Sequence, residues 1–278
     1  MQEFGKIMIC ATPIGNLDDI SQHLVDALTS ADTIFAEDTR VTSKLIAHLQ
    51  LEKPIKRLDE NVMDKHAADV ISAAESGQIV AYCSDAGTPG VSDPGLKIVE
   101  AARQANVDVE VVPGPSAVLA AYVASGFTNQ KFFFGGFLPR KDNARKNELE
   151  ALAKLDAVLI FYESPNRLVK TLELIAEVFG EGQVSVCREL TKMHEEVSIG
   201  PASDVFEEFK QRESIKGEIV ICVDSKPKEE EPEVEPTNKL ANYLANSGFK
   251  SSEISSVLQD VFGVSKNEAY QIALDAKE

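Results

Sequence analysis

The chain has 278 residues, of which 44% are hydrophobic, and a formal net charge of −17. This length and apolar content allow a substantial core and favour about two domains. The acidic excess argues against a protein that binds nucleic acid through a broadly positive surface, so any such contact must be local. No apolar run approaches the roughly 20 residues that span a bilayer, and the N-terminus lacks signal-peptide features. We therefore expect a cytoplasmic protein with no membrane partner.

The cysteines and histidines argue against disulfides and metal. The four cysteines lie far apart in β-branched runs, which is typical of small buried hydrophobic residues. The four histidines show no ligand-like spacing, so we expect no metal site. The cysteines are Cys10, Cys83, Cys187 and Cys222, and the histidines are His23, His48, His66 and His194.

Strand-like runs alternate with amphipathic stretches in the first part of the chain. This alternation predicts βαβ units and a mainly parallel sheet, whose ligands bind beyond the carboxyl ends of the strands. The predicted strands are Lys6–Ala11, Thr33–Glu37, Gln78–Cys83 and Val107–Val112, and the predicted helices include Ile20–Ser30 and Leu96–Gln104.

The pattern continues after Gly114, which predicts a second α/β domain. We place the two domains at residues 1–116 and 117–224, with a cleft between them. The predicted strands are Lys131–Phe134, Ala157–Tyr162, Gln183–Glu189, Glu195–Ile199 and Gly217–Val223, and the predicted helices are Asn143–Lys154, Arg167–Phe179 and Asp204–Arg212.

The composition changes at residues 225–237, SKPKEEEPEVEPT, which predict an extended acidic linker. Residues 238–278 then show three short helical patterns, Asn238–Asn246, Ser251–Phe262 and Ser265–Lys277, with Gly248 and Gly263 expected at helix C-caps. Ser265 and Glu268 have the spacing of a capping box. The module resembles a helix-turn-helix, but its last helix is not basic, which argues against reading duplex DNA.

Three turns rich in glycine and proline follow predicted strands of the first domain. They are Thr12–Asn16, Asp85–Gly95 and Val112–Ala117, where Pro115 is expected in the first turn of a helix. Glycines let a ligand approach the backbone, so three such turns at one sheet edge predict a pocket, although ordinary strand-to-helix connections are the alternative. The dinucleotide fingerprint G-x-G-x-x-G and the P-loop are absent, which argues against a dinucleotide or polyphosphate site.

Eight segments together resemble, in order, the ribosomal RNA small-subunit methyltransferase I family of the tetrapyrrole-methylase superfamily. The resemblance implies two α/β domains of the class III methyltransferase type with a cofactor cleft between them, S-adenosylmethionine as cofactor, a homodimer, and 2′-O-methylation of a cytidine in the decoding region of 16S rRNA within the small ribosomal subunit. The segments are ATPIGNLDDIS, FAEDTR, DAGTPGVSDPG, VPGPSA, GFLPRK, FYESPNR, CRELTKMHEE and KGEIVI.

The same resemblance carries cofactor contacts onto positions of this chain. In the first domain they fall in the three turns, and in the second domain they close over the cofactor. The positions are Pro13, Gly15, Asp85, Ala86, Gly87, Thr88, Pro89, Val91, Ser116, Ala117, Tyr162, Glu163 and Leu190.

Methyl transfer is an in-line displacement, so the enzyme mainly aligns two reactants and needs no metal. A ribose hydroxyl profits from a general base. Among the carboxylates at strand ends, we favour Asp38 or Glu37; helix capping or pairing with Arg40 is the alternative role.

A basic cluster follows the aromatic strand at residues 132–134. Its density of cations suits phosphate contacts, although a solvated helix start is the alternative. The candidate RNA-binding residues are Arg140, Lys141, Arg145, Lys146 and Arg167. Two other functions stay open: methylation of a tetrapyrrole or another small acceptor on the same fold, and a non-catalytic protein that only senses the cofactor.

Overall fold

The computed structural model describes residues 5–58, 63–226 and 236–277. The chain divides into two compact units, Met1–Lys226 and Pro227–Glu278. Most of the predicted linker, residues 227–235, lies outside the described residues. Within the described part of the chain, no helix has the length and apolar content that crossing a membrane requires.

The first sheet is parallel throughout, as predicted from the alternation of strands and helices. Its strand order is β3-β2-β4-β1-β5. The short edge strand β3 was not predicted, because its sequence IKR has no apolar run. The strands are β1 (Lys6–Cys10), β2 (Thr33–Ala36), β3 (Ile55–Arg57), β4 (Ile79–Cys83) and β5 (Asp108–Val112).

Helices cover both faces of the first sheet, so it has two apolar cores. α1 starts where the Ser21 hydroxyl accepts a hydrogen bond from the Leu24 amide, and α2 starts at Asp38 in the same way. The sequence did not identify α2 or α3. The helices are α1 (Gln22–Ser30), α2 (Thr39–His48), α3 (Met63–Glu75) and α4 (Gly95–Gln104), with a 3₁₀ turn η1 (Leu17–Asp19) before α1.

The second sheet corrects the expectation of mainly parallel pairing. Its order is β6-β7-β10-β8-β9, and only the β6–β7 pair is parallel. A parallel crossover takes roughly a dozen residues or more, and the short β8–β9 connection forces an antiparallel pair. The strands are β6 (Phe132–Phe137), β7 (Ala157–Glu163), β8 (Gln183–Arg188), β9 (Glu196–Pro201) and β10 (Ile219–Ser225).

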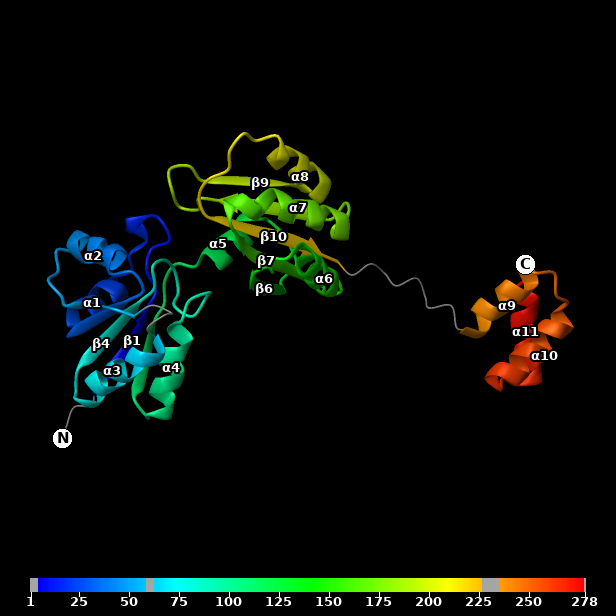
Figure 1. Ribbon diagram of the computed structural model, residues 1–278, viewed down its shortest axis with the longest axis horizontal. Helices are drawn as coiled ribbons and strands as arrows, with labels where there is room; N and C mark the ends of the chain where they lie inside the picture. The colour runs from blue at the N-terminus through cyan, green and yellow to red at the C-terminus, as the bar shows by residue number, and fades with distance from the viewer. Residues whose placement is uncertain (1–4, 59–62, 227–235, 278) are drawn as a thin grey trace. The chain divides into compact units, whose positions relative to one another are not determined.

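Helices pack on both faces of the second sheet too. α5 (Ala117–Ala124) follows the first sheet in the chain and packs on one face through Val118 and Ala121 (Figure 1). Ser116 is its N-cap, so Pro115 lies before the helix and not in its first turn, which corrects the sequence prediction. The other face is covered by α6 (Asp142–Leu152), α7 (Pro165–Phe179) and α8 (Ala202–Lys210). The four cysteines are all buried and free, as predicted.

The C-terminal unit is a three-helix module. It contains α9 (Pro236–Asn246), α10 (Ser251–Phe262) and α11 (Lys266–Asp275) around a small apolar core. Gly263 ends α10 in a left-handed conformation, φ 67°, as expected for a C-cap, and the Ser265 hydroxyl accepts from the Glu268 amide to start α11.

Candidate functional site

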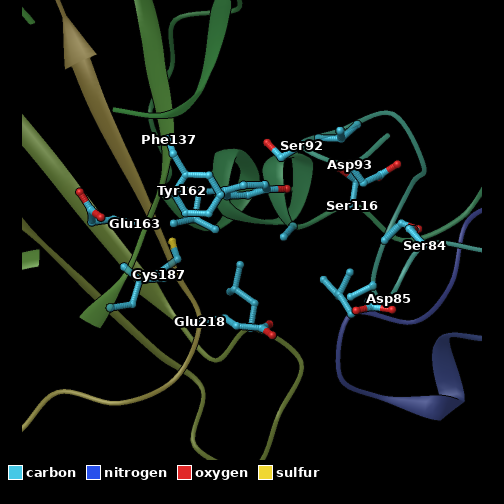
Figure 2. Close-up of a pocket in the computed structure, with 18 of the residues that line it drawn as sticks. Ser84, Asp85, Ser92, Asp93, Ser116, Phe137, Tyr162, Glu163, Cys187 and Glu218 are labelled. Atoms are coloured by element: carbon cyan, nitrogen blue, oxygen red, sulfur yellow. The ribbon is translucent and has the colours of Figure 1, made fainter. Parts of the chain in front are cut away.

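A cavity of about 480 Å³ lies where strand ends of both sheets meet (Figure 2). β10 runs antiparallel to β7 and β8, so its start lies at the same edge as their ends. The lining therefore comes from the segments after four strands of the first sheet, β1, β2, β4 and β5, and from three strand ends of the second, together with α5 and β6. The lining residues are Ile14, Glu37, Ser84, Asp85, Ala86, Gly87, Thr88, Val91, Ser92, Asp93, Ser116, Ala117, Phe137, Tyr162, Glu163, Ser164, Pro165, Cys187, Leu190, Gly217, Glu218, Ile219 and Val220.

The first two turns are joined by their backbones. The Thr12 amide donates to the Gly87 carbonyl at 2.9 Å, and the Gly87 amide donates to the Thr12 carbonyl at 3.0 Å. Gly87 has φ 79°, and a Cβ there would lie 3.3 Å from Cγ2 of Ile14. This wall is built of backbone because a side chain at Gly87 would strain the turn and crowd the lining.

The second turn is fixed by its own side chains. The carboxylate of Asp93 accepts hydrogen bonds from the amides of Gly90, at 2.9 Å, and Gly95, at 2.7 Å. The Thr88 hydroxyl donates to the Pro115 carbonyl at 3.2 Å, which ties the second turn to the third. The three turns thus form one connected wall.

The facing wall carries aromatic side chains, as Figure 2 shows. The rings of Phe137 and Tyr162 lie 5.6 Å apart, centroid to centroid. Burial, reinforced by the charges of Asp93 and Glu218, raises the pKa of Tyr162 to about 12. The phenol is therefore neutral at physiological pH, and this side of the cavity offers two aromatic rings inclined at 60° to each other, with one hydroxyl.

A segment after β8 reaches the first turn. A Cβ on Gly15 would lie 2.5 Å from Cγ of Lys192, so the two segments are in close contact. The Lys192 ammonium pairs with Glu189 at 2.9 Å and with Glu218 at 3.0 Å. Hydrogen bonding from the Glu218 amide, together with Lys192, lowers the pKa of Glu189. The Glu189 carboxylate therefore ties this segment to the start of β10.

The cavity is acidic. Five acidic residues line it, namely Glu37, Asp85, Asp93, Glu163 and Glu218, and none of the described lining residues is basic. The carboxylate of Glu163 pairs with Arg167 and that of Glu218 with Lys192, so Glu37, Asp85 and Asp93 contribute most of the negative charge. Burial raises the pKa of Asp85, an effect opposed by the hydrogen bond from the Asp38 amide. Such a lining attracts a cation and repels phosphate.

The structure brings most of the predicted cofactor residues to this cavity. Ten of them line it: Asp85, Ala86, Gly87, Thr88, Val91, Ser116, Ala117, Tyr162, Glu163 and Leu190. Pro13, Gly15 and Pro89 lie in the turns without lining the cavity. Sequence reasoning missed Phe137, Cys187 and the Gly217–Val220 stretch. The segments GFLPRK, CRELTKMHEE and KGEIVI contain them, but the sequence does not show that they meet at one edge. β10 runs antiparallel to β7 and β8, and Phe137 pairs with Tyr162 across the β6–β7 pair.

The two candidate bases differ in position. The Asp38 carboxylate caps α2 and pairs with Arg40 at 2.5 Å, and hydrogen bonds from Arg40 lower the pKa of Asp38 to about 2. Glu37 lines both the large cavity and a second cavity of about 270 Å³, which shares Ser92 and Asp93 with it and also contacts Pro94, Leu96 and Lys97. Glu37 therefore stands at the junction of the two spaces.

The basic cluster separates into exposed and buried members. Arg140 and Lys141 are exposed, and Lys146 pairs with Glu177. Arg145 is only 2% exposed, and its guanidinium donates to backbone carbonyls, so a surface phosphate cannot reach it. Arg167 is partly buried and also bonds to carbonyls. The sequence predicted that these five residues contact RNA from one basic surface. Arg145 is buried, so the prediction is wrong for this residue.

Comparison with known proteins decides the family. A model of the tetrapyrrole (corrin/porphyrin) methylases matches residues 6–205, which is most of the chain. The chain belongs to the tetrapyrrole methylase family. Solved structures agree in fold: the methyltransferase CobJ superposes with a TM-score of 0.61 at 20% identity, covering 80% of this chain and 94% of that one. The cobalt precorrin-4 methyltransferase CbiF gives a TM-score of 0.60 at 18% identity, covering 78% and 94%.

Curated relatives narrow the group within this methylase family. Proteins named ribosomal RNA small subunit methyltransferase I are 40% identical in Bacillus subtilis, covering 96% of this chain and 94% of the relative, and 36% identical in Haemophilus influenzae, covering 97% and 96%. The Thermotoga maritima protein of that name is 40% identical over 80% of this chain and 99% of its own length. The chain is therefore a methyltransferase of this group, with the two-sheet fold that the resemblance implied.

Proposed function

We propose that this chain transfers a methyl group from S-adenosylmethionine to the ribose 2′-oxygen of a cytidine in the decoding region of 16S rRNA. The observation that supports the donor is the acidic cavity, whose described lining holds acidic residues such as Glu37, Asp85 and Asp93 and no basic one, which suits a cationic cofactor better than a phosphate-bearing nucleotide. The names of the relatives support the acceptor. An enzyme that acts on small ribosomal subunits works in the cytoplasm, so we also propose a cytoplasmic location.

The residues fit this cofactor. The backbone wall at Gly87 leaves room close to the main chain, and the rings of Phe137 and Tyr162 present apolar faces against which a purine can pack. When bound, S-adenosylmethionine supplies an electrophilic methyl group on a sulfonium. Because that positive charge disappears during transfer, a carboxylate against the sulfur would stabilise the ground state, so the carboxylates are better placed against the amino group.

Glu37 is the general base that the geometry supports best. It lines the large cavity and also the smaller cavity beside it, where an acceptor can approach the donor. Asp38 is a weaker choice, because its carboxylate is held by Arg40 and its pKa of about 2 makes it a poor proton acceptor. Glu37 would accept the proton of the 2′-hydroxyl as the bond between the methyl carbon and the ribose oxygen forms and the methyl–sulfur bond breaks, which leaves S-adenosylhomocysteine.

The test uses the full chain with methyl-labelled cofactor and purified small subunits that lack the modification. A 2′-O-methyl group blocks alkaline cleavage of the adjoining phosphodiester, so the label should appear in an alkali-resistant dinucleotide that starts with cytidine. Label released as a mononucleotide would mean base methylation. Label found in an added tetrapyrrole and absent from RNA would overturn the proposed acceptor, and cofactor binding without any transfer would overturn catalysis.

We also infer that the chain forms a homodimer through α5 and the neighbouring edge strand β6. α5 is apolar all round, yet Leu119 and Val123 are 52% and 75% exposed on it. Phe132 of β6 is exposed as well, and its ring lies 5.3 Å from that of Tyr122 in α5, so the patch extends onto β6. A second copy would cover this apolar face.

Light scattering tests the dimer. The wild-type chain should have twice the mass of one chain, and Val123→Glu should give a single-chain mass because it places a charge in the apolar patch. Val261→Glu is the matched control, since Val261 is 60% exposed in the separate helical module and should leave the dimer intact. A single-chain mass for the wild type contradicts the dimer.

A further inference from the structure

Two arginines hold one surface turn by its backbone. The turn is Leu138–Lys141, called here the basic turn, between β6 and α6. Arg145 donates to the carbonyl oxygens of Pro139 at 3.0 Å and Arg140 at 3.1 Å. Arg167 donates to the carbonyl oxygens of Leu138 at 2.7 Å and Pro139 at 3.1 Å. Three successive carbonyls are thus fixed by two guanidinium groups.

Both arginines are anchored behind the turn. Arg145 lies 3.5 Å from the Asp142 carboxylate. Arg167 lies 3.3 Å from the carboxylate of Glu163, which also accepts from the Ser164 amide at 2.7 Å and the Thr171 hydroxyl at 2.6 Å. Glu163 lines the cavity, so the turn is connected through Arg167 to the wall of that cavity.

Burying a guanidinium is costly unless its donors are used, and a surface turn needs no such support merely to exist. The side chains that the basic turn presents give a reason for burying these two arginines. Arg140 and Lys141 are exposed at its tip, and Phe137, the residue before the turn, lines the cavity. Two exposed cations are therefore held on the turn that leaves the cavity lining at Phe137, and they oppose the repulsion between the acidic lining and a polyanion.

We propose that Arg145 and Arg167 are positioning residues that fix the basic turn, so that Arg140 and Lys141 meet phosphates of the RNA beside the acceptor nucleotide. The proposal rests on the proposed RNA-methylating function. Arg145 and Arg167 themselves do not touch the RNA. They act through the turn, and this separates them from the two exposed cations with which the sequence groups them.

The experiment is a double-mutant cycle in the full chain with small ribosomal subunits. Replacing Arg140 and Lys141 with Gln should raise the KM for the subunit about tenfold. The slope of log KM against log salt concentration should fall by the amount that corresponds to about one to two phosphate contacts. Arg145→Met should raise KM similarly and lower the salt dependence too, while kcat and the cofactor Kd stay within about twofold.

The combined triple variant decides the mechanism. If Arg145 acts through the turn, Arg145→Met adds almost nothing once Arg140 and Lys141 are Gln. If the effects on KM multiply, Arg145 acts independently of the two cations and the proposal is overturned. An unchanged KM for Arg145→Met overturns it as well.

Arg167→Lys is the second variant. It keeps the positive charge, and Arg167 is less buried than Arg145, so we expect this variant to fold. Nη2 of Arg167 donates to both carbonyls while Nε lies 3.3 Å from the Glu163 carboxylate. A lysine has a single nitrogen and cannot reach the carbonyls and Glu163 together, so KM should rise about threefold to tenfold with kcat unchanged. Lys170→Met is the control: it removes a cation from the same helix that pairs only with Glu173 among the described contacts, and KM should stay at the wild-type value.

The outcomes separate the positioning role of the two arginines from the proposed RNA methylation. A wild-type enzyme that methylates RNA while Arg145→Met leaves KM unchanged rejects the positioning role alone. A wild-type enzyme that never labels RNA rejects the function, and the positioning role with it.

Discussion

The wall of the cavity that follows the first sheet is made largely of backbone, whereas the wall that follows the second sheet is made of side chains. On the first side, Thr12 and Gly87 exchange amide hydrogen bonds and glycine leaves room for a ligand. On the second side, the rings of Tyr162 and Phe137 shape the cavity, and the buried carboxylate of Glu163 ties β7 to Thr171 and Arg167. On the first side, a substitution should therefore disturb the cavity by adding atoms to it. On the second side, a substitution should weaken the wall by removing side-chain contacts.

The largest expected effect is on the side-chain wall. Glu163 is 3% exposed, and replacing it with alanine leaves the Thr171 hydroxyl and the Arg167 guanidinium without their carboxylate partner. We expect Glu163→Ala to lower the free energy of unfolding by about 2 to 3 kcal/mol, measured by urea denaturation. Glu163→Gln keeps the shape and one oxygen, so it should lose about half as much. Equal stability of the alanine variant would show that side chains do not hold this wall.

The backbone wall is tested by adding one methyl group. Gly87→Ala puts a Cβ 3.3 Å from Ile14 at a φ of 79°, into the cavity lining. We expect the Kd for S-adenosylmethionine to rise about tenfold by calorimetry, with about 1 kcal/mol lost in the free energy of unfolding.

Gly126→Ala is the control for backbone strain. Gly126 has φ 67° and open space around its Cβ position, away from the cavity lining. It should lose a similar stability of about 1 kcal/mol while the cofactor Kd stays unchanged. If both variants weaken cofactor binding equally, the effect of Gly87 is general strain and not its place in the wall.

The same contrast explains how far the sequence could predict the site. The turn at residues 85–95 was predictable because glycine and proline have local conformational signatures, and most of its residues line the cavity. The second wall was harder, because Gly217–Val220 and Cys187 meet there only through antiparallel pairing with β10, which local periodicity does not encode. The burial of Arg145 was equally invisible, since a buried arginine and an exposed one look alike in a basic segment.

Side chains also hold the outer edge of the second sheet, which offers the smallest test. Glu196 of β9 accepts from Arg212 at 2.5 Å and from Arg188 at 2.8 Å. These hydrogen bonds, with Arg212 the larger cause, lower the pKa of Glu196 from 4.5 to about 2. The folded state therefore binds this proton less readily than the unfolded state, so the pair stabilises the fold above pH 4.5 and loses its contribution as the pH falls toward 2.

We expect Glu196→Gln to lower the free energy of unfolding by about 1 kcal/mol at pH 6, because the pair is partly exposed and solvent screens it. The difference from the wild type should shrink as the pH falls below 4.5 and vanish near 2, measured by urea denaturation across that range. Glu213→Gln is the control: Glu213 is exposed, and the described residues show no ion pair for it, so its effect at pH 6 should be small. A difference that stays constant with pH would mean that Glu196 acts through packing, and the edge of this sheet would then depend on shape more than on charge.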